Sequence, residues 1–186
     1  MSRKGVTAGV IAALAVFVGA GVYVAYEDHI ILSGTDSSAP QAFNSPDIGL
    51  SFAYPQNYQL NVSDDQEGAV RIITLIDKAD LPVGQSTEGP PSITIERFDN
   101  PQNLPLDQWI RTTPASNWQL SNMGELGAST VGSESGLGYI YSGLYEETAV
   151  GVAHNGKIYL FSVGIRAAED RIKADFLALL DSVQFI

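Results

Sequence analysis

An Asn-Gly dipeptide at positions 155 and 156 separates two mostly apolar segments, residues 148–154 and 157–165. Both central residues of a type I′ turn need positive φ, and Asn followed by Gly adopts this turn readily. The two segments are therefore predicted to be neighbouring antiparallel strands. The domain that contains them is expected to be built on an antiparallel sheet.

Other segments also carry apolar residues with the period of a β-strand. Within residues 92–97, Ile93 and Ile95 are expected to point inward and Glu96 outward. Apolar residues at both parities, as in residues 69–76, predict a strand that is covered on both faces. In chain order, the predicted strands are residues 50–54, residues 69–76, residues 92–97, a segment around Val131 and residues 139–144.

Two segments have the pattern of helices. Residues 105–111 begin with a proline in the first turn and must end before Pro114, and Trp109 is interpreted as the side chain that docks this helix. Residues 169–182 carry one apolar stripe, which predicts a helix lying on the core. Residues 183–186 are expected to close the domain in a short extended segment. The predicted class is α+β, a central antiparallel β-sheet flanked by helices.

The N-terminal region has the pattern of a single transmembrane helix. Arg3 and Lys4 precede 22 residues without a charge, residues 5–26, which is enough helix to cross a hydrocarbon core of ~30 Å. By the positive-inside tendency, residues 1–4 form a cytoplasmic basic tail and the rest of the chain lies outside. Tyr23 and Tyr26 fall where interfacial aromatic residues are favoured.

Two further interpretations of this region stay open. A cleaved secretory signal, with the small residues 18–20 as its cleavage site, would release a secreted domain to the same extracytoplasmic side. Gly5 and Gly9 have the spacing that lets transmembrane helices approach closely, although anchors are rich in Gly in any case.

A polar segment, residues 27–46, is predicted to link the anchor to a single domain, residues 47–186. Residues 33–46 read Ser-Gly-Thr-Asp-Ser-Ser-Ala-Pro-Gln-Ala-Phe-Asn-Ser-Pro, a composition typical of linkers. A random coil of that length reaches about 20 Å. The domain is therefore expected to stand clear of the membrane surface.

Composition excludes several classes of function. The chain has 10 Lys and Arg against 21 Asp and Glu, a formal net charge of −11. This charge argues against nucleic-acid binding, because contacts with phosphates need clustered Lys and Arg side chains. It has no cysteine, which excludes disulfides, thiolate metal sites and cysteine nucleophiles. No cofactor is expected.

The order of these segments resembles the PsbP-like superfamily. Residues 48–55 read Ile-Gly-Leu-Ser-Phe-Ala-Tyr-Pro, a strand Pro-Ser-Ile-Thr-Ile follows at 91–95, and Leu-Asp-Gln-Trp-Ile stands at 106–110. The chain closes on Phe-Leu-Ala-Leu-Leu-Asp-Ser-Val-Gln-Phe at 176–185. The resemblance implies a central antiparallel sheet between helices, in a bacterial, extracytoplasmic, membrane-anchored member. It also implies roles in binding and assembly, with no common catalytic residues to carry over.

No catalytic or zinc-binding constellation is predicted. Residues 132–136 have the glycine spacing of a nucleophile elbow, but Glu134 stands in place of the nucleophilic serine, so a turn is favoured. The chain has two histidines, His29 beside the anchor and His154 beside the Asn-Gly turn, and both positions suit solvated residues. The chain is therefore not expected to be an enzyme.

One acidic turn is a weak calcium candidate. Asp64, Asp65 and Glu67 could offer oxygens to the ion, but the segment lacks the spacing of an EF-hand loop. A polar turn between two strands is the favoured interpretation.

Aromatic side chains are the remaining candidates for a binding surface. Trp118 lies in a polar stretch without clear period, and Tyr139, Tyr141 and Tyr145 share a parity around the second pair of strands. Tyrosines suit recognition surfaces because they bury area while keeping a polar tip. In a covered sheet, however, they more often border the core.

The predicted function is a non-catalytic, membrane-tethered extracytoplasmic module that binds or assembles with another envelope protein. The alternative is a carboxylate-based hydrolase that acts on cell-envelope polymers. A cleft with two close acids would favour the hydrolase, and a shallow aromatic face would favour the module.

Overall fold

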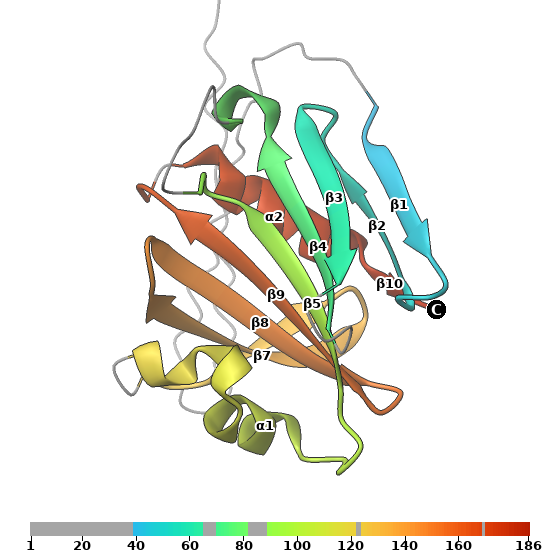
Figure 1. Ribbon diagram of the computed structural model, residues 1–186, viewed down its shortest axis with the longest axis vertical. Helices are drawn as coiled ribbons and strands as arrows, with labels where there is room; N and C mark the ends of the chain where they lie inside the picture. Colours follow the sequence, from blue (N-terminus) through green and yellow to red (C-terminus); the bar gives the residue numbers. More distant parts are fainter. Residues whose placement is uncertain (1–38, 65–69, 82–88, 122–123, 169) are drawn as a thin grey trace, which may run out of the picture. The chain divides into compact units, whose positions relative to one another are not determined.

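The structure, a computed structural model, describes residues 39–64, 70–81, 89–121, 124–168 and 170–186, and about half of them lie in two antiparallel sheets (Figure 1). The larger sheet has seven strands in the order β3-β4-β5-β9-β8-β7-β6, and the smaller has three in the order β1-β2-β10. The strands are β1 (Gln41–Ser45), β2 (Leu50–Tyr54), β3 (Tyr58–Asp64), β4 (Arg71–Asp77), β5 (Ile93–Asp99), β6 (Gly127–Val131), β7 (Glu134–Ser142), β8 (Glu146–His154), β9 (Lys157–Ile165) and β10 (Gln184–Phe185).

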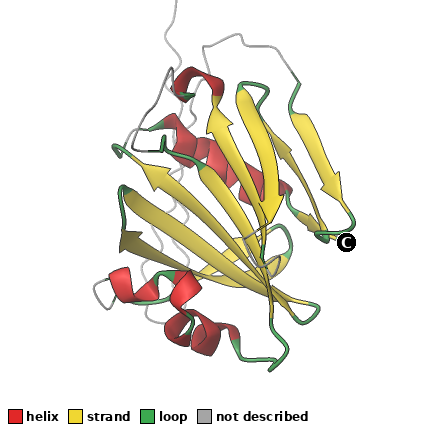
Figure 2. Ribbon diagram, viewed as in Figure 1, coloured by secondary structure: helices red, strands yellow, loops and turns green. Residues whose placement is uncertain are grey.

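The described part of the chain has few helices (Figure 2). They are α1 (Leu106–Thr112) and α2 (Arg171–Ser182), with the 3-10 turns η1 (Lys78–Asp80), η2 (Pro114–Ser116) and η3 (Trp118–Leu120). The α+β prediction, an antiparallel sheet with helices, is thus confirmed for these residues.

The hairpin predicted from Asn155 and Gly156 is present as β8 and β9. Both residues have positive φ, 48° and 71°, and the register pairs His154 with Lys157 across the turn. The turn chemistry that identified this hairpin therefore also sets its register.

One face of the larger sheet packs on α2 and on the smaller sheet. The shared core contains β2 residues such as Leu50 and Phe52 and inward residues of the sheet such as Phe161, all less than 4% exposed. From α2 it includes the predicted apolar stripe, which consists of Ile172, Phe176, Leu179 and Leu180, with Val183 just beyond the helix.

The opposite face carries a second core beneath α1. Trp109 is 4% exposed and its ring lies 5.1 Å from that of Phe98 on β5, which confirms that it docks the helix. α1 follows Pro105 and ends at Thr112, before Pro114, because proline cannot continue the ladder of helical hydrogen bonds. Leu106 and Ile110 come closest to the sheet over Gly151, where there is no side chain in the way.

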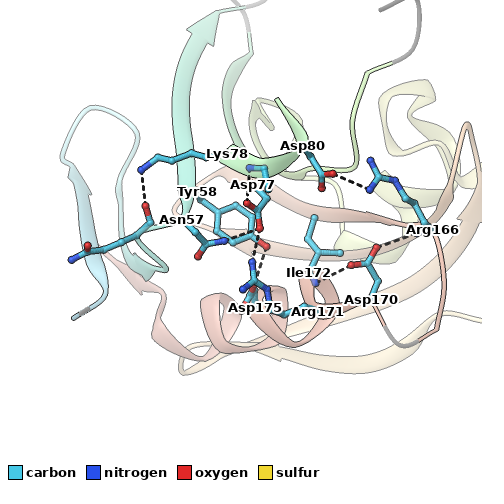
Figure 3. A network of polar contacts seen from close by, with 12 residues as sticks. Asn57, Tyr58, Asp77, Lys78, Asp80, Arg166, Asp170, Arg171, Ile172 and Asp175 are labelled. Carbon is cyan, nitrogen blue, oxygen red and sulfur yellow. Dashed lines mark hydrogen bonds and ion pairs between the residues drawn. The ribbon is translucent and has the colours of Figure 1, made fainter. Parts of the chain in front are cut away.

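A polar network ties the start of α2 to the ends of β3 and β4 (Figure 3). The Tyr58 hydroxyl donates to the Asp175 carboxylate at 2.8 Å, and the Arg171 guanidinium pairs with both Asp175 and Asp77. Asn57 donates to the same Asp77 carboxylate at 2.7 Å. This network, called the α2 clamp below, joins residues from three elements.

Two expectations need correction. Residues 41–45, predicted to lie in the linker, form β1, because pairing with β2 and the stacking of Phe43 on Phe52 at 5.0 Å stabilise a segment with weak strand character. β4 is fully buried on one face only, since Ile73 and Leu75 are buried while Ile72 and Ile76 are half-buried.

The predicted basic tail, the anchor with Gly5, Gly9, Tyr23 and Tyr26, and most of the linker lie outside the described residues. Within residues 39–186, as far as they are described, no helix is long and apolar enough to span a bilayer.

Candidate binding site

The structure brings three of the four predicted aromatic residues together. Trp118 in η3 makes an edge-on contact with Tyr139 on β7, with ring centroids 5.4 Å apart, and Tyr141 follows at 6.0 Å from Tyr139. Tyr145 is separate, in the turn between β7 and β8, where its hydroxyl donates to the Gly89 carbonyl. The predicted row is therefore a cluster of three and one isolated tyrosine.

Burial removes two members of this cluster from the surface. Tyr139 is 4% exposed and Tyr141 is 8% exposed, and burial raises the pKa of both phenols. The Tyr139 hydroxyl donates to the Ser116 carbonyl, so it is occupied within the protein. η2 and η3 thus cover the sheet at Tyr139 and Tyr141, and a role for these two residues in binding a partner stays a prediction.

Trp118 is half-buried, and the Arg111 guanidinium lies 4.8 Å from the centre of its ring. This cation–π contact occupies one face of the indole. A role for Trp118 and Tyr145 in binding stays a prediction.

The calcium candidate is only partly described. Asp65 and Glu67 lie outside the described residues, while Asp64 pairs with Arg71 at 2.6 Å. Among the residues whose side chains are described, no group of three or more His, Asp or Glu could hold a metal ion.

Two acidic residues, Glu96 on β5 and Glu147 on β8, are half-buried on the α1 side of the larger sheet. Burial raises the pKa of Glu96 on β5 and of Glu147 on β8 to about 7. Sequence reasoning placed Glu96 outward, which is correct for its parity, but missed that this face is covered. Glu147 escaped notice for the same reason.

These two acids are poorly placed to act as a catalytic pair. The register sets Glu96 opposite Leu160 and Glu147 opposite Gly164, on the two sides of β9. Four residues along a strand span about 13 Å, whereas paired carboxyl groups in glycosidases stand roughly 5–10 Å apart.

A groove of about 580 Å³ lies beside β10. Its walls come from the turn between β6 and β7, from the end of β8, and from the end of α2 with β10. The lining residues are 132–134, His154 and 181–185. We call it the β10 groove.

Gly132 brings these segments together. Its φ is +56°, and its N–H donates to the Leu180 carbonyl at 2.7 Å, which caps the end of α2. A Cβ at this position would collide with the Val183 carbonyl. Only glycine therefore lets the turn pack this closely against the backbone of Val183. The Gly-Ser turn predicted here is confirmed, and it forms one wall of the groove.

Two polar contacts hold the histidine of the groove in place. His154 Nδ1 lies 3.3 Å from the Glu134 carboxylate, and Asn155 Nδ2 lies 3.0 Å from Nε2. A carboxylate oxygen can only accept, so Nδ1 is the donor in the contact with Glu134. Glu134 and Asp181 bring two carboxyl groups to the lining of the groove.

Aromatic rings support one side of the groove. The His154 ring stacks on Phe185, with centroids 4.7 Å apart and planes at 26°, and Phe185 meets Tyr159 edge-on at 5.1 Å. The Tyr159 hydroxyl is buried and donates to the Ile48 carbonyl, which holds this stack against the core. A ligand in the groove would thus meet a rigid aromatic surface beside two carboxylates.

Sequence reasoning missed this site. His154 was expected to be solvated, and Glu134 was considered only as a failed nucleophile position. The residues come from opposite ends of the domain, and no local pattern shows that β10 returns beside the hairpin turn. The remaining sequence signal was a glycine two residues before an acid, which is common in ordinary turns.

No family model matches the chain, and no curated protein sequence matches it. Among solved structures, the chain is similar to cyanobacterial PsbP (CyanoP) from Synechocystis sp. PCC 6803, with 16% identity and a TM-score of 0.53. That match covers 82% of this chain and 96% of the cyanobacterial one. A protein from Bacteroides thetaiotaomicron is also similar, with 11% identity and a TM-score of 0.48, covering 78% of this chain and 48% of that one.

The match to the cyanobacterial protein extends over nearly the whole of that protein. Identity is too low to transfer a ligand or a partner, since one fold hosts many functions. The chain has a PsbP-like fold, as the resemblance in its sequence implied.

Proposed function

We propose that this chain is a non-catalytic binding or assembly module, tethered to a membrane by its N-terminal segment with its folded domain on the extracytoplasmic side. The observation that carries the proposal is the β10 groove. It combines fixed negative charge and a rigid aromatic wall in one accessible hollow of about 580 Å³.

The composition of the groove suits recognition. Interfaces use aromatic side chains for contact area and a few placed polar groups for specificity. The groove has this composition, with Phe185 and His154 as the aromatic wall and Glu134 and Asp181 as the polar groups. The PsbP-like fold is a further support, because the sequence resemblance implies binding and assembly for proteins of this kind.

The tether is proposed from the sequence. Residues 5–26 are uncharged and follow two basic residues, which favours a single span with the domain outside. Attachment to a membrane raises the effective concentration of the domain near other membrane proteins, so a modest affinity would be sufficient. The proposed partner class is therefore another envelope protein.

Photo-crosslinking in cells tests this function. A photoreactive amino acid replaces Ser133, an exposed residue of the groove, in the full chain, and Gln108, an exposed residue of α1, serves as the matched control position. We expect a discrete adduct with another envelope protein from position 133, recovered with the membranes, and none from position 108.

The opposite result would favour the hydrolase. If position 133 yields no discrete adduct while the purified chain degrades a cell-envelope polymer, the binding module is the wrong interpretation.

A further inference from the structure

No described strand pairs with the edge of β10 that faces the groove. Within the described sheets β10 has one neighbour, β2. The Ile186 N–H donates to the Gly49 carbonyl on the β2 side at 3.1 Å. Peptide groups of a strand alternate between its two sides, so the N–H and C=O of Phe185 point away from β2.

The position of Gly132 confirms this direction. A Cβ on Gly132 would collide with the Val183 carbonyl oxygen, so that carbonyl faces the turn between β6 and β7. Phe185 follows Val183 by two residues, and its peptide groups therefore point the same way. They face the β10 groove, whose lining also includes residues 132–134.

An exposed strand edge of this kind is a template for another strand. The N–H and C=O of Phe185 can each form a hydrogen bond with an extended backbone that lies beside β10. Side chains of an added strand would alternate, so every second one would point toward the aromatic stack of His154 and Phe185. The groove is thus shaped for main-chain pairing.

Charge decides which peptide fits. Glu134 and Asp181 both line the groove, and the Glu134 carboxylate lies 3.3 Å from His154 Nδ1. Asp181 is exposed and has no ion-pair partner among the described residues. A lysine or arginine would be attracted, whereas an acidic segment, or a second copy of this acidic chain, would be repelled.

We propose that the β10 groove binds an extended, basic peptide segment of a partner protein. The segment adds a strand beside β10, hydrogen-bonds to Phe185, and sets a Lys or Arg side chain against Glu134 and Asp181. This inference rests on the proposed function, since it names the chemistry of the partner that the module would hold.

Binding of defined peptides to the full chain in mild detergent tests the inference. The probes are fluorescein-labelled peptides of alternating threonine and valine, with lysine at one position at a time, and matched peptides with norleucine or glutamate there. We expect a lysine peptide to bind about 5- to 20-fold more tightly than its norleucine counterpart, and the glutamate peptide to bind weakest. Methylation of the peptide nitrogen that pairs with Phe185 should abolish the difference.

Variants locate the site. Glu134→Gln and Asp181→Asn should each weaken binding of the lysine peptide about 3- to 10-fold, while Glu125→Gln removes the same charge from an exposed position outside the groove and should leave binding unchanged. Circular dichroism verifies that each variant is folded. The NMR signal of the Phe185 amide should shift downfield when the peptide binds.

A lysine peptide that binds no more tightly than the norleucine peptide, or that is unaffected by both groove variants, overturns the inference. A crosslinked partner at position 133 combined with that result would keep the module and reject the basic peptide. Selective lysine binding without any crosslinked partner in cells would keep the peptide chemistry and reject the assembly role.

Discussion

At the scale of single residues, Gly132 has more structural consequence than its turn position suggests. It lies in the turn of the β6–β7 hairpin and packs closely against the Val183 carbonyl. Its N–H also donates a hydrogen bond to the Leu180 carbonyl at the end of α2. Three parts of the fold therefore converge on one residue without a side chain. The walls of the β10 groove depend on this convergence.

Replacing Gly132 with alanine is expected to lower the free energy of unfolding by about 2–4 kcal/mol, because the positive φ is strained for alanine and its Cβ collides with backbone rather than with a flexible side chain. Gly143→Ala is the matched control, since its nearest neighbours would be 3.8 Å away. Urea denaturation followed by circular dichroism measures both. Equal stability of the two variants would show that the turn does not pack on Val183 as described.

What could be predicted at this scale depended on backbone chemistry. The turn at Asn155 and Gly156 could be predicted, because few residue pairs tolerate two positive φ values. The sequence left open whether Tyr139 and Tyr141 border the core or a surface, because the answer depends on where η2 and η3 lie, which no residue of β7 encodes. The same holds for His154, whose partner Phe185 is brought beside it only by the tertiary fold.

At the scale of elements, two separate sets of contacts fix α2 to the rest of the domain. Its apolar stripe packs on the core, and the α2 clamp fastens its first turns to β3 and β4. Tyr58 is 2% exposed, and burial together with the hydrogen bond to Asp175 raises the pKa of its phenol above the usual range. The hydroxyl thus stays a donor throughout the ordinary pH range.

Tyr58→Phe is expected to destabilise the domain by about 1–2 kcal/mol, since it removes a buried donor and leaves Asp175 with Arg171 as its other partner. Tyr54→Phe is the control: that hydroxyl makes a longer contact, 3.5 Å, with Gln41, and its loss should cost less than about 0.5 kcal/mol. Chemical denaturation distinguishes the two. A larger loss for Tyr54→Phe would mean that the clamp contributes little.

The elements themselves were largely predictable. Both helices follow their apolar residues and, for α1, the flanking prolines, and the strand predicted around Val131 is β6. The strand predicted at residues 139–144 is β7, but β7 begins earlier, at Glu134, and ends at Ser142. β1 was missed because Gln-Ala-Phe-Asn-Ser has one large apolar residue among turn formers. Its stability comes from β2 and from the Phe43–Phe52 stack, which are partners rather than properties of the segment.

At the scale of the whole molecule, the two half-buried acids on the α1 side link stability to pH. Burial raises the pKa of Glu96 and of Glu147 from 4.5 to about 7. Between these values the folded state binds more protons than the unfolded state, so stability falls as pH rises. The exposed Asp99 has the opposite sign, because Lys157 lowers its pKa, but it acts at lower pH.

We expect the free energy of unfolding to decrease by about 2 kcal/mol in total between pH 5 and pH 8, and the double variant Glu96→Gln with Glu147→Gln to remove most of that slope. At pH 8 the double variant should be more stable than the native chain. Denaturation curves across this pH range measure the slope, with Glu125→Gln as the control for charge alone. A native slope that the double variant retains would contradict the assignment.

The smaller sheet also has a consequence for the order of folding. Hydrogen bonds between Ala53 and Ser182 join residues 129 apart in the sequence, and β10, which follows α2 in the chain, pairs with β2. Contacts of such long range form late, because the intervening chain must first lose its freedom. The β10 groove is therefore expected to be among the last features to form during folding. A partner that requires it would discriminate between a finished domain and one still folding.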